Sequence, residues 1–219
     1  HNLHTVLVYD VHRLGHTAYG VLCFTAFQQA VMVWGFNTEK NLEKIGCRAI
    51  VAECGYFAYF QKAVTGYVAV PVFMSSLLQV SFIQQVIGVE KNVGIVCFQK
   101  RFLTEDHLRS VGIVPGSNYL IAGSSDEYDC EEFNNLWNWE KRKPLPEAYY
   151  EKSEREIIRT CQDFVDKNPS IGAIMLECTG MQPFSRAIQR EIDLPVFDWG
   201  TLLDYAYSAV AHRDYYGHV

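Results

Sequence analysis

Two cysteines, Cys54 and Cys178, occupy matching places in an internal repeat of the chain. Residues 49–73 align with residues 173–197 without a gap, at a constant offset of 124 positions. Nine of the 25 aligned positions are identical, where about one or two would be expected by chance at ordinary composition. The repeat therefore singles out these two thiols among seven cysteines, and we expect the other five to be packing residues.

Two thiols held on opposite sides of one carbon could exchange its proton. Inverting a carbon next to a carboxylate needs one group that removes the α-proton and a second group that delivers a proton to the opposite face. With each sulfur about 3–3.5 Å from that carbon, the sulfurs would lie about 7 Å apart, too far for a disulfide. An ordinary thiol is mostly protonated at pH 7, so we expect the helix N-terminus after one cysteine to lower its pKa.

Each copy of the repeat reads as a strand, a helix and a second strand. The first strand is an apolar run, residues 49–52 or 171–176, and the second passes through Pro-Val-Phe. Such a unit makes a right-handed crossover between parallel strands, whose carboxyl ends are where ligands bind. We therefore predict an α/β protein of two pseudosymmetric parallel-sheet domains, with the active site in the cleft between them.

The remaining periodic segments extend the two halves. We place residues 1–89 and 198–219 in the first domain and residues 90–197 in the second, and we expect residues 123–146 to be irregular. Further strands are predicted at 5–9, 93–97 and 119–122, and helices at 39–45, 75–87, 104–111, 147–167 and 199–211.

Three segments resemble the aspartate/glutamate racemase superfamily, in its two-cysteine branch. They are Ala-Ile-Val-Ala-Glu-Cys-Gly-Tyr-Phe at 49–57, Pro-Val-Phe-Met-Ser-Ser-Leu-Leu-Gln at 71–79 and Leu-Glu-Cys-Thr-Gly-Met at 176–181. The resemblance implies a cofactor-independent racemase or epimerase of a small carboxylic acid, such as aspartate or glutamate, with Cys54 and Cys178 as acid and base. It also implies a homodimer.

The resemblance has one departure and leaves alternatives open. Amino-acid racemases of the superfamily carry Cys-Asn-Thr at the first motif, where Asn and Thr help to hold the substrate carboxylate, whereas this chain has Cys54-Gly55-Tyr56. A maleate-type cis–trans isomerase, an arylmalonate-decarboxylase-like enzyme and a non-catalytic small-molecule binding protein remain as alternatives.

Further residues beside the cysteines are candidates for binding the substrate carboxylate. Ser75 and Ser76 follow a predicted strand and open a helix, where their hydroxyls could bind an anion or cap the helix. Thr179 follows the second cysteine, as Gly55 follows the first, and we include both.

A glutamate precedes the cysteine in both copies, Glu53 in the first and Glu177 in the second. Strand alternation turns neighbouring side chains to opposite faces, so we expect these glutamates to form structural ion pairs or hydrogen bonds rather than to act as acids or bases.

Composition argues against several other kinds of protein. Hydrophobic residues make up 49% of the 219 residues, which is enough to build a core, and a net charge of −6 without a basic block argues against nucleic-acid binding. Residues 18–36 carry no charge, but Gln28 and Gln29 at their centre and the lack of basic flanks favour burial over a membrane span. We expect a cytoplasmic, reduced protein without a secretory signal.

The sequence gives little reason to expect a metal or an organic cofactor. Asp10, His12 and His16 are polar neighbours, but no HExxH pattern accompanies them, and no dinucleotide or phosphate-binding loop is present. The expected partner is a small carboxylate substrate alone.

Overall fold

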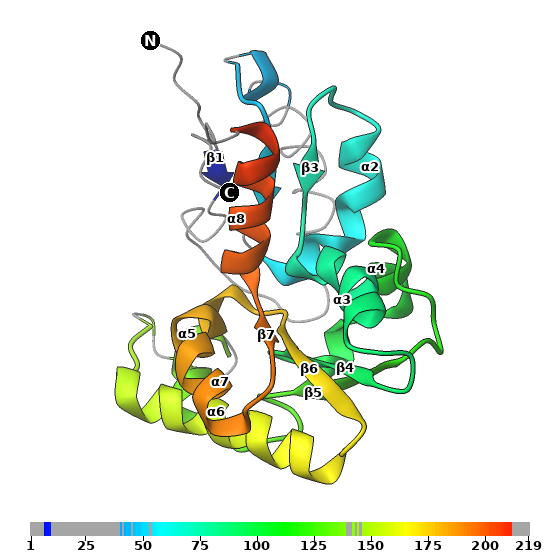
Figure 1. The fold of residues 1–219 in the computed structure, drawn as a ribbon. Coiled ribbons are helices and arrows are strands. Elements are labelled where there is room, and N and C mark those ends of the chain that lie inside the picture. Colours follow the sequence, from blue (N-terminus) through cyan, green and yellow to red (C-terminus); the bar gives the residue numbers. More distant parts are fainter. Residues whose placement is uncertain are drawn as a thin grey trace, which may run out of the picture.

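Two parallel sheets form the centre of the protein (Figure 1). The computed structural model describes residues 40, 42–44, 46–52, 54–138, 142, 144 and 146–211, and the backbone of residues 7–9. One sheet has the order β1 (Leu7–Tyr9), β2 (Ile50–Ala52), β3 (Val72–Phe73), and the other has the order β5 (Tyr119–Gly123), β4 (Asn92–Cys97), β6 (Ile171–Leu176), β7 (Val196–Phe197). Every strand pairing in both sheets is parallel, which confirms the predicted fold class.

Short helices follow the strands, and several begin with a 3-10 turn. They are η2 (Gly55–Phe60), α2 (Gln61–Thr65), η3 (Ser76–Gln79), α3 (Val80–Val86), η4 (Lys100–Phe102), α4 (Glu105–Ser110), α5 (Glu131–Trp137), α6 (Tyr150–Lys167), η5 (Thr179–Phe184), α7 (Ser185–Ile192) and α8 (Trp199–Val210). The helices predicted around α3, α4, α6 and α8 are confirmed, with ends that differ by a few residues.

The sequence repeat is also a repeat in the structure. β2 pairs with β3 in the same register as β6 pairs with β7. The Ile50 N–H donates to the Pro71 carbonyl at 2.9 Å, and the Ile174 N–H donates to the Pro195 carbonyl at the same distance, 124 positions later. The two strand–helix–strand units are therefore built alike.

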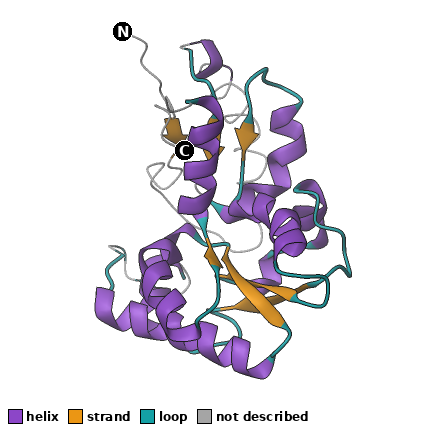
Figure 2. Cartoon of the chain, viewed as in Figure 1, coloured by secondary structure: helices purple, strands orange, loops and turns teal. Residues whose placement is uncertain are grey.

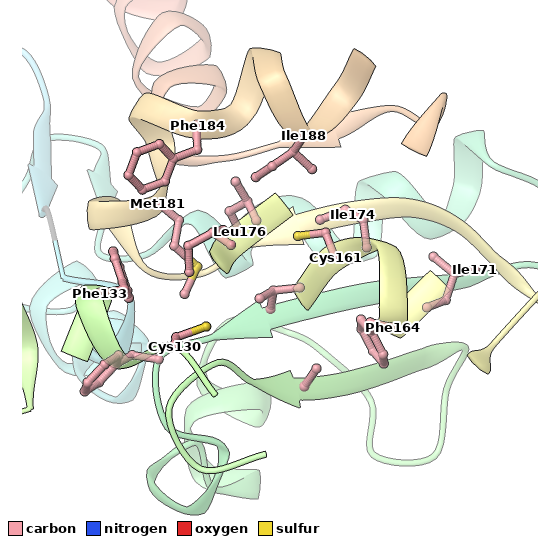
Figure 3. Packing of buried hydrophobic residues seen from close by; sticks show 14 residues of the cluster. Cys130, Phe133, Cys161, Phe164, Ile171, Ile174, Leu176, Met181, Phe184 and Ile188 are labelled. Atoms are coloured by element: carbon pink, nitrogen blue, oxygen red, sulfur yellow. The ribbon is translucent and has the colours of Figure 1, made fainter. Parts of the chain in front are cut away.

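The second sheet is buried on both faces, as parallel sheets usually are (Figure 2). Alternate residues of β6 pack on opposite faces of the sheet: Ile174 and Leu176 belong to one hydrophobic cluster, and Met175 belongs to the other. Figure 3 shows the first cluster, in which Phe184 and Ile188 cover the sheet. Burial on both faces explains why the sequence of β6 is apolar throughout, without polar alternation.

The two halves exchange the helices that follow their last strands. Helix α3 comes after β3 of the first sheet, yet its Val80 and Ile83 pack in the cluster of the second sheet. Helix α8 comes after β7 of the second sheet and runs back beside the first (Figure 1), where the rings of Phe73 and Tyr205 lie 6.4 Å apart. The domain boundaries at 89/90 and 197/198 stay a prediction.

One segment that we expected to be irregular contains a helix. Residues 131–137 form α5, and its Phe133 is fully buried. The Glu156 carboxylate, from α6, accepts hydrogen bonds of 2.9 Å from the backbone N–H groups of Glu132 and Phe133. The prediction was wrong because the group that caps this helix comes from a distant part of the chain.

Two reciprocal hydrogen bonds join the halves. The Ser76 hydroxyl, just after β3, donates to the Leu176 carbonyl at the end of β6 over 3.2 Å. The Trp199 indole, just after β7, donates to the Ala52 carbonyl at the end of β2 over 3.0 Å. The two acceptors are 124 positions apart, so each half holds the equivalent strand end of the other.

We expect both bonds to contribute to stability. Ser76→Ala and Trp199→Phe each remove one donor, and each should lower the free energy of unfolding by about 1 kcal/mol, with a further loss of packing in the tryptophan variant. Urea unfolding of each variant and of the wild type measures this difference in the free energy of unfolding. Ser208→Ala is the control, because its hydroxyl bonds only to the Tyr205 carbonyl on the exposed side of α8; losses no larger than in this control would contradict the role of the reciprocal bonds.

Candidate active site

Cys54 and Cys178 lie at equivalent points of the two halves. Each is the N-cap of a 3-10 helix, with φ and ψ of −87° and 123° at Cys54 and −79° and 121° at Cys178. Their carbonyls accept from the N–H groups of Phe57 and Met181, respectively, both at 3.0 Å. Both side chains are partly exposed. The repeat thus presents two thiols with the same backbone geometry.

The two thiols lie close enough to influence each other electrostatically. Burial raises the pKa of the Cys178 thiol well above its usual range, and the charge of the neighbouring Glu177 raises it further. Hydrogen bonding from the Gly180 and Met181 backbone lowers this pKa, whereas the charge of Cys54 raises it. The helix start therefore favours the Cys178 thiolate, but burial outweighs it, and the lowered pKa that we expected for one of the two cysteines stays a prediction.

Ser75 and Ser76 are buried, and the fold uses both hydroxyls. The Ser75 hydroxyl accepts from the Leu77 N–H at 3.2 Å and caps η3. The Ser76 hydroxyl donates to carbonyls at the end of β6. Thr179, by contrast, is partly exposed as the first residue of η5, directly after Cys178. Binding of a carboxylate by these three residues stays a prediction.

Gly55 packs tightly against Glu177. A Cβ atom at Gly55 would overlap the side-chain carboxyl and the backbone oxygen of Glu177, so only glycine fits here without a shift. Glu177 is 1% exposed, and neither of its carboxyl oxygens has a hydrogen-bond partner among the described residues. Burial raises the pKa of Glu177 to about 8. The ion pair or hydrogen bond that we expected for this side chain is absent from the described structure, and that prediction is wrong; Glu53 lies outside the described residues.

Tyr56 connects the first cysteine motif to the second sheet. Its hydroxyl donates to the Gln99 carbonyl and accepts from the Gln99 N–H, both at 2.9 Å, two residues beyond the end of β4. Burial raises the pKa of Tyr56 well above its usual range, so the hydroxyl stays protonated. Sequence reasoning noted the tyrosine only as a departure from Cys-Asn-Thr and did not assign it this role.

By sequence, the chain is similar to curated dimethylsulfoniopropionate lyases. It is 30% identical to the lyase of Durusdinium sp. clade D over 157 residues, which are 70% of this chain and 49% of that protein. It is 28% identical to lyase 6 of Emiliania huxleyi over 165 residues, which are 72% of this chain and 41% of that protein. The chain thus spans about half of these relatives or less, and no family model matches it.

The solved structures that it resembles are racemases and a decarboxylase. A glutamate racemase of Bacillus anthracis matches with a TM-score of 0.60 at 12% identity, over 93% of this chain and 70% of that chain. An allantoin racemase of Pseudomonas fluorescens matches with a TM-score of 0.55 at 18% identity, over 75% of this chain and 62% of that chain. Arylmalonate decarboxylase matches with a TM-score of 0.53 at 12% identity, over 86% of this chain and 79% of that chain.

The chain has the fold of the aspartate/glutamate racemase superfamily. The resemblance of the two cysteine motifs is thereby confirmed at the level of the fold. In this superfamily fold the described residues place Cys54 and Cys178 at equivalent strand ends.

Other predicted or possible sites lie elsewhere. Asp10, His12 and His16 are outside the described residues, within which no three His, Cys, Asp or Glu side chains cluster as a metal site. No helix in the described part of the chain is long and apolar enough to cross a membrane. A cavity of about 390 Å³ opens beside β5, between Lys100 and Lys167, and its lining includes no residue of the cysteine motifs.

The buried carboxyl should make stability depend on pH. Its pKa rises from 4.5 in the unfolded chain to about 8 in the folded protein, so the folded state holds this proton while the unfolded state loses it. The contribution of this group to the free energy of unfolding is largest below pH 4.5. It decreases as the pH rises to 8, by roughly 5 kcal/mol at most. Glu177→Gln should flatten that slope in urea unfolding measured from pH 5 to 8; equal slopes in both proteins would contradict the assignment.

Tyr56→Phe tests the contact between the motif and the second sheet. The variant leaves the Gln99 carbonyl and N–H without the tyrosine hydroxyl, which should cost about 1–3 kcal/mol of stability in thermal or urea unfolding. Tyr205→Phe, at an exposed ring on α8, is the matched control and should change stability by less than about 0.5 kcal/mol. Equal effects of the two changes would show that the Tyr56 hydroxyl is dispensable.

Proposed function

We propose that this chain is a cofactor-independent enzyme that removes the α-proton of a small carboxylate with a cysteine thiolate, and that it cleaves dimethylsulfoniopropionate by β-elimination. The paired cysteines at equivalent strand ends carry the proposal. The relatives by sequence supply the substrate, because they are named dimethylsulfoniopropionate lyases. The structural neighbours named racemases and decarboxylase are enzymes as well.

Racemisation and this elimination share their first step. In both, a thiolate takes the proton from the carbon next to a carboxylate. In dimethylsulfoniopropionate the electron pair of that C–H bond forms a double bond to the β-carbon, and the bond from the β-carbon to the sulfonium sulfur breaks. Dimethyl sulfide leaves with the electron pair, acrylate remains, and the cysteine returns its proton to the solvent. The leaving group departs neutral, so no acid has to protonate it.

The substrate carboxylate needs a partner that stabilises charge as the α-proton leaves. Thr179 is the best candidate among the predicted residues, because it is partly exposed beside Cys178 and opens η5. Its hydroxyl can donate a hydrogen bond to an anion. Ser75 and Ser76 are less suited, because their hydroxyls are already engaged within the fold.

Racemisation of aspartate, glutamate or another small carboxylate is the second candidate. The fold favours it, since the glutamate and allantoin racemases share that fold with this chain. A racemase must accept either enantiomer, so each cysteine has to serve as base in one direction and as acid in the other. The cis–trans isomerase and the decarboxylase have no comparable support from the relatives by sequence.

Product analysis separates the candidates. With dimethylsulfoniopropionate we expect dimethyl sulfide by gas chromatography and an equal amount of acrylate by NMR. The serine variant of the cysteine that acts as the base, Cys54→Ser or Cys178→Ser, should reduce the rate by about 10²- to 10⁴-fold, because serine cannot supply a thiolate at neutral pH. Cys47→Ser, at a buried cysteine outside the repeat, should keep the activity of the folded wild type.

Two results would overturn this proposal. If the protein releases no dimethyl sulfide but racemises aspartate or glutamate with incorporation of deuterium from D2O at the α-carbon, the second candidate would replace the first. Release of dimethyl sulfide at near wild-type rates by both serine variants would remove the cysteine mechanism.

A further inference from the structure

A tryptophan from outside the two cysteine motifs lies against the second motif. Trp137 is the last residue of α5, and its indole occupies the space that a side chain at Gly180 would need. A Cβ atom at Gly180 would stand 2.7 Å from Nε1 of the indole and 2.9 Å from its Cε2 and Cζ2. Because Gly180 directly follows Cys178 and Thr179 in the chain, the ring lies beside the turn that carries both.

The indole is held in place and remains partly exposed. Trp137 packs against the hydrophobic cluster of Figure 3, and so does Cys178. Phe133 anchors α5 in this cluster, and the Glu156 carboxylate caps the start of the helix. A ring that is fixed in this way can contact a ligand without first being ordered, which saves part of the cost of binding.

We propose that Trp137 is a specificity-determining residue that binds the positively charged sulfonium group of the substrate on the face of its ring. This assignment rests on the proposed function and deepens it, because it names the side chain that takes the cationic end of dimethylsulfoniopropionate. Thr179 is the proposed partner of the other end, the carboxylate.

The chemistry of a sulfonium favours an aromatic face over a hydrogen-bond acceptor. Its sulfur carries three carbon substituents and no hydrogen, so an oxygen acceptor gains no conventional hydrogen bond from it. An aromatic face attracts a cation within about 6 Å of the ring centroid, and tryptophan is the best aromatic side chain for this purpose. The ammonium group of aspartate or glutamate is instead a hydrogen-bond donor, so an indole suits the lyase substrate better than the amino acids.

The size of the substrate agrees with the spacing of the two proposed partners. Two carbon atoms join the sulfonium to the carboxylate, so a carboxylate bound at Thr179 keeps the cation in the immediate surroundings of that residue. Trp137 contacts the next residue of the chain, Gly180. This contact therefore places the ring where the cationic end of a substrate held at Thr179 can reach it.

The buried Glu177 is a poorer partner for the cation. Its carboxyl lies against Gly55, is 1% exposed and has a pKa of about 8, so it is largely uncharged at neutral pH. The face of an indole attracts a cation whatever the pH, because the attraction comes from the ring quadrupole.

The binding of two matched ligands tests this proposal without turnover. In β-trimethylammoniopropionate a quaternary ammonium, which is a poorer leaving group, replaces the sulfonium; its neutral analogue has a carbon atom in place of the nitrogen. Calorimetric titration of the full chain gives the affinity of each ligand. In Trp137→Leu we expect the ratio of the cation's affinity to that of the neutral analogue to fall by about 3- to 30-fold, and Trp137→Phe, which retains a ring, should lose less.

Tyr150→Leu is the matched control. Tyr150 also contacts η5, but its hydroxyl donates to the Pro183 carbonyl and its ring centroid lies 5.2 Å from that of Phe184, at the opposite end of the helix from Cys178. This variant should keep the wild-type affinity ratio. The neutral analogue reports on the fold, because general damage to the site would weaken both ligands alike and leave their ratio unchanged.

The outcomes are distinct from those of the activity assay. No binding of the cation by the wild type, a wild-type affinity ratio in Trp137→Leu, or an equal fall of the ratio in both leucine variants overturns this proposal even if dimethyl sulfide is formed. A fall of the ratio in Trp137→Leu but not in Tyr150→Leu upholds the cation site, and in that case an absence of dimethyl sulfide would count against the proposed reaction only.

Discussion

The geometry of the site depends on two reciprocal hydrogen bonds between the ends of the strands that lead to the cysteines. Ser76 holds the end of β6 and Trp199 holds the end of β2, and each acceptor carbonyl stands two residues before a cysteine. Because both donors come from segments that have just left the opposite sheet, neither half can turn without breaking a bond to the other. The packing of α3 against the second sheet reinforces this constraint by burying Val80 and Ile83 across the junction.

Burial decides the electrostatics of the site more than local helix structure does. A helix start favours a thiolate by a fraction of a unit charge, whereas moving a thiol or a carboxyl out of water opposes its ionisation more strongly. Cys178 shows the balance, because N–H groups from its own helix lower its pKa and burial still prevails. The same burial raises the pKa of Glu177, whose carboxyl has no hydrogen-bond partner among the described residues.

Much of the fold, but less of the site, could be predicted from the sequence. A gapless repeat of apolar runs and prolines is sufficient to indicate two like strand–helix–strand units, because both features act locally. Three features of the structure depend on residues that are distant in the chain. Glu156 caps helix α5, Gln99 bonds to the Tyr56 hydroxyl, and Gly55 packs against the Glu177 carboxyl. β6 ends at Leu176, so strand alternation does not extend to Glu177, and the sequence cannot show whether its carboxyl has a partner.

The first cysteine motif shows how a racemase fold could support another reaction. In the amino-acid racemases that the motif resembles, the two residues after the first cysteine help to hold the substrate carboxylate. Here Gly55 has no side chain and Tyr56 turns its hydroxyl to Gln99, so the side chains at these two positions cannot hold the carboxylate. In the proposed function that task falls to Thr179, beside Cys178. The carboxylate would then be held from the second half alone, an unsymmetrical arrangement that a one-base elimination can use.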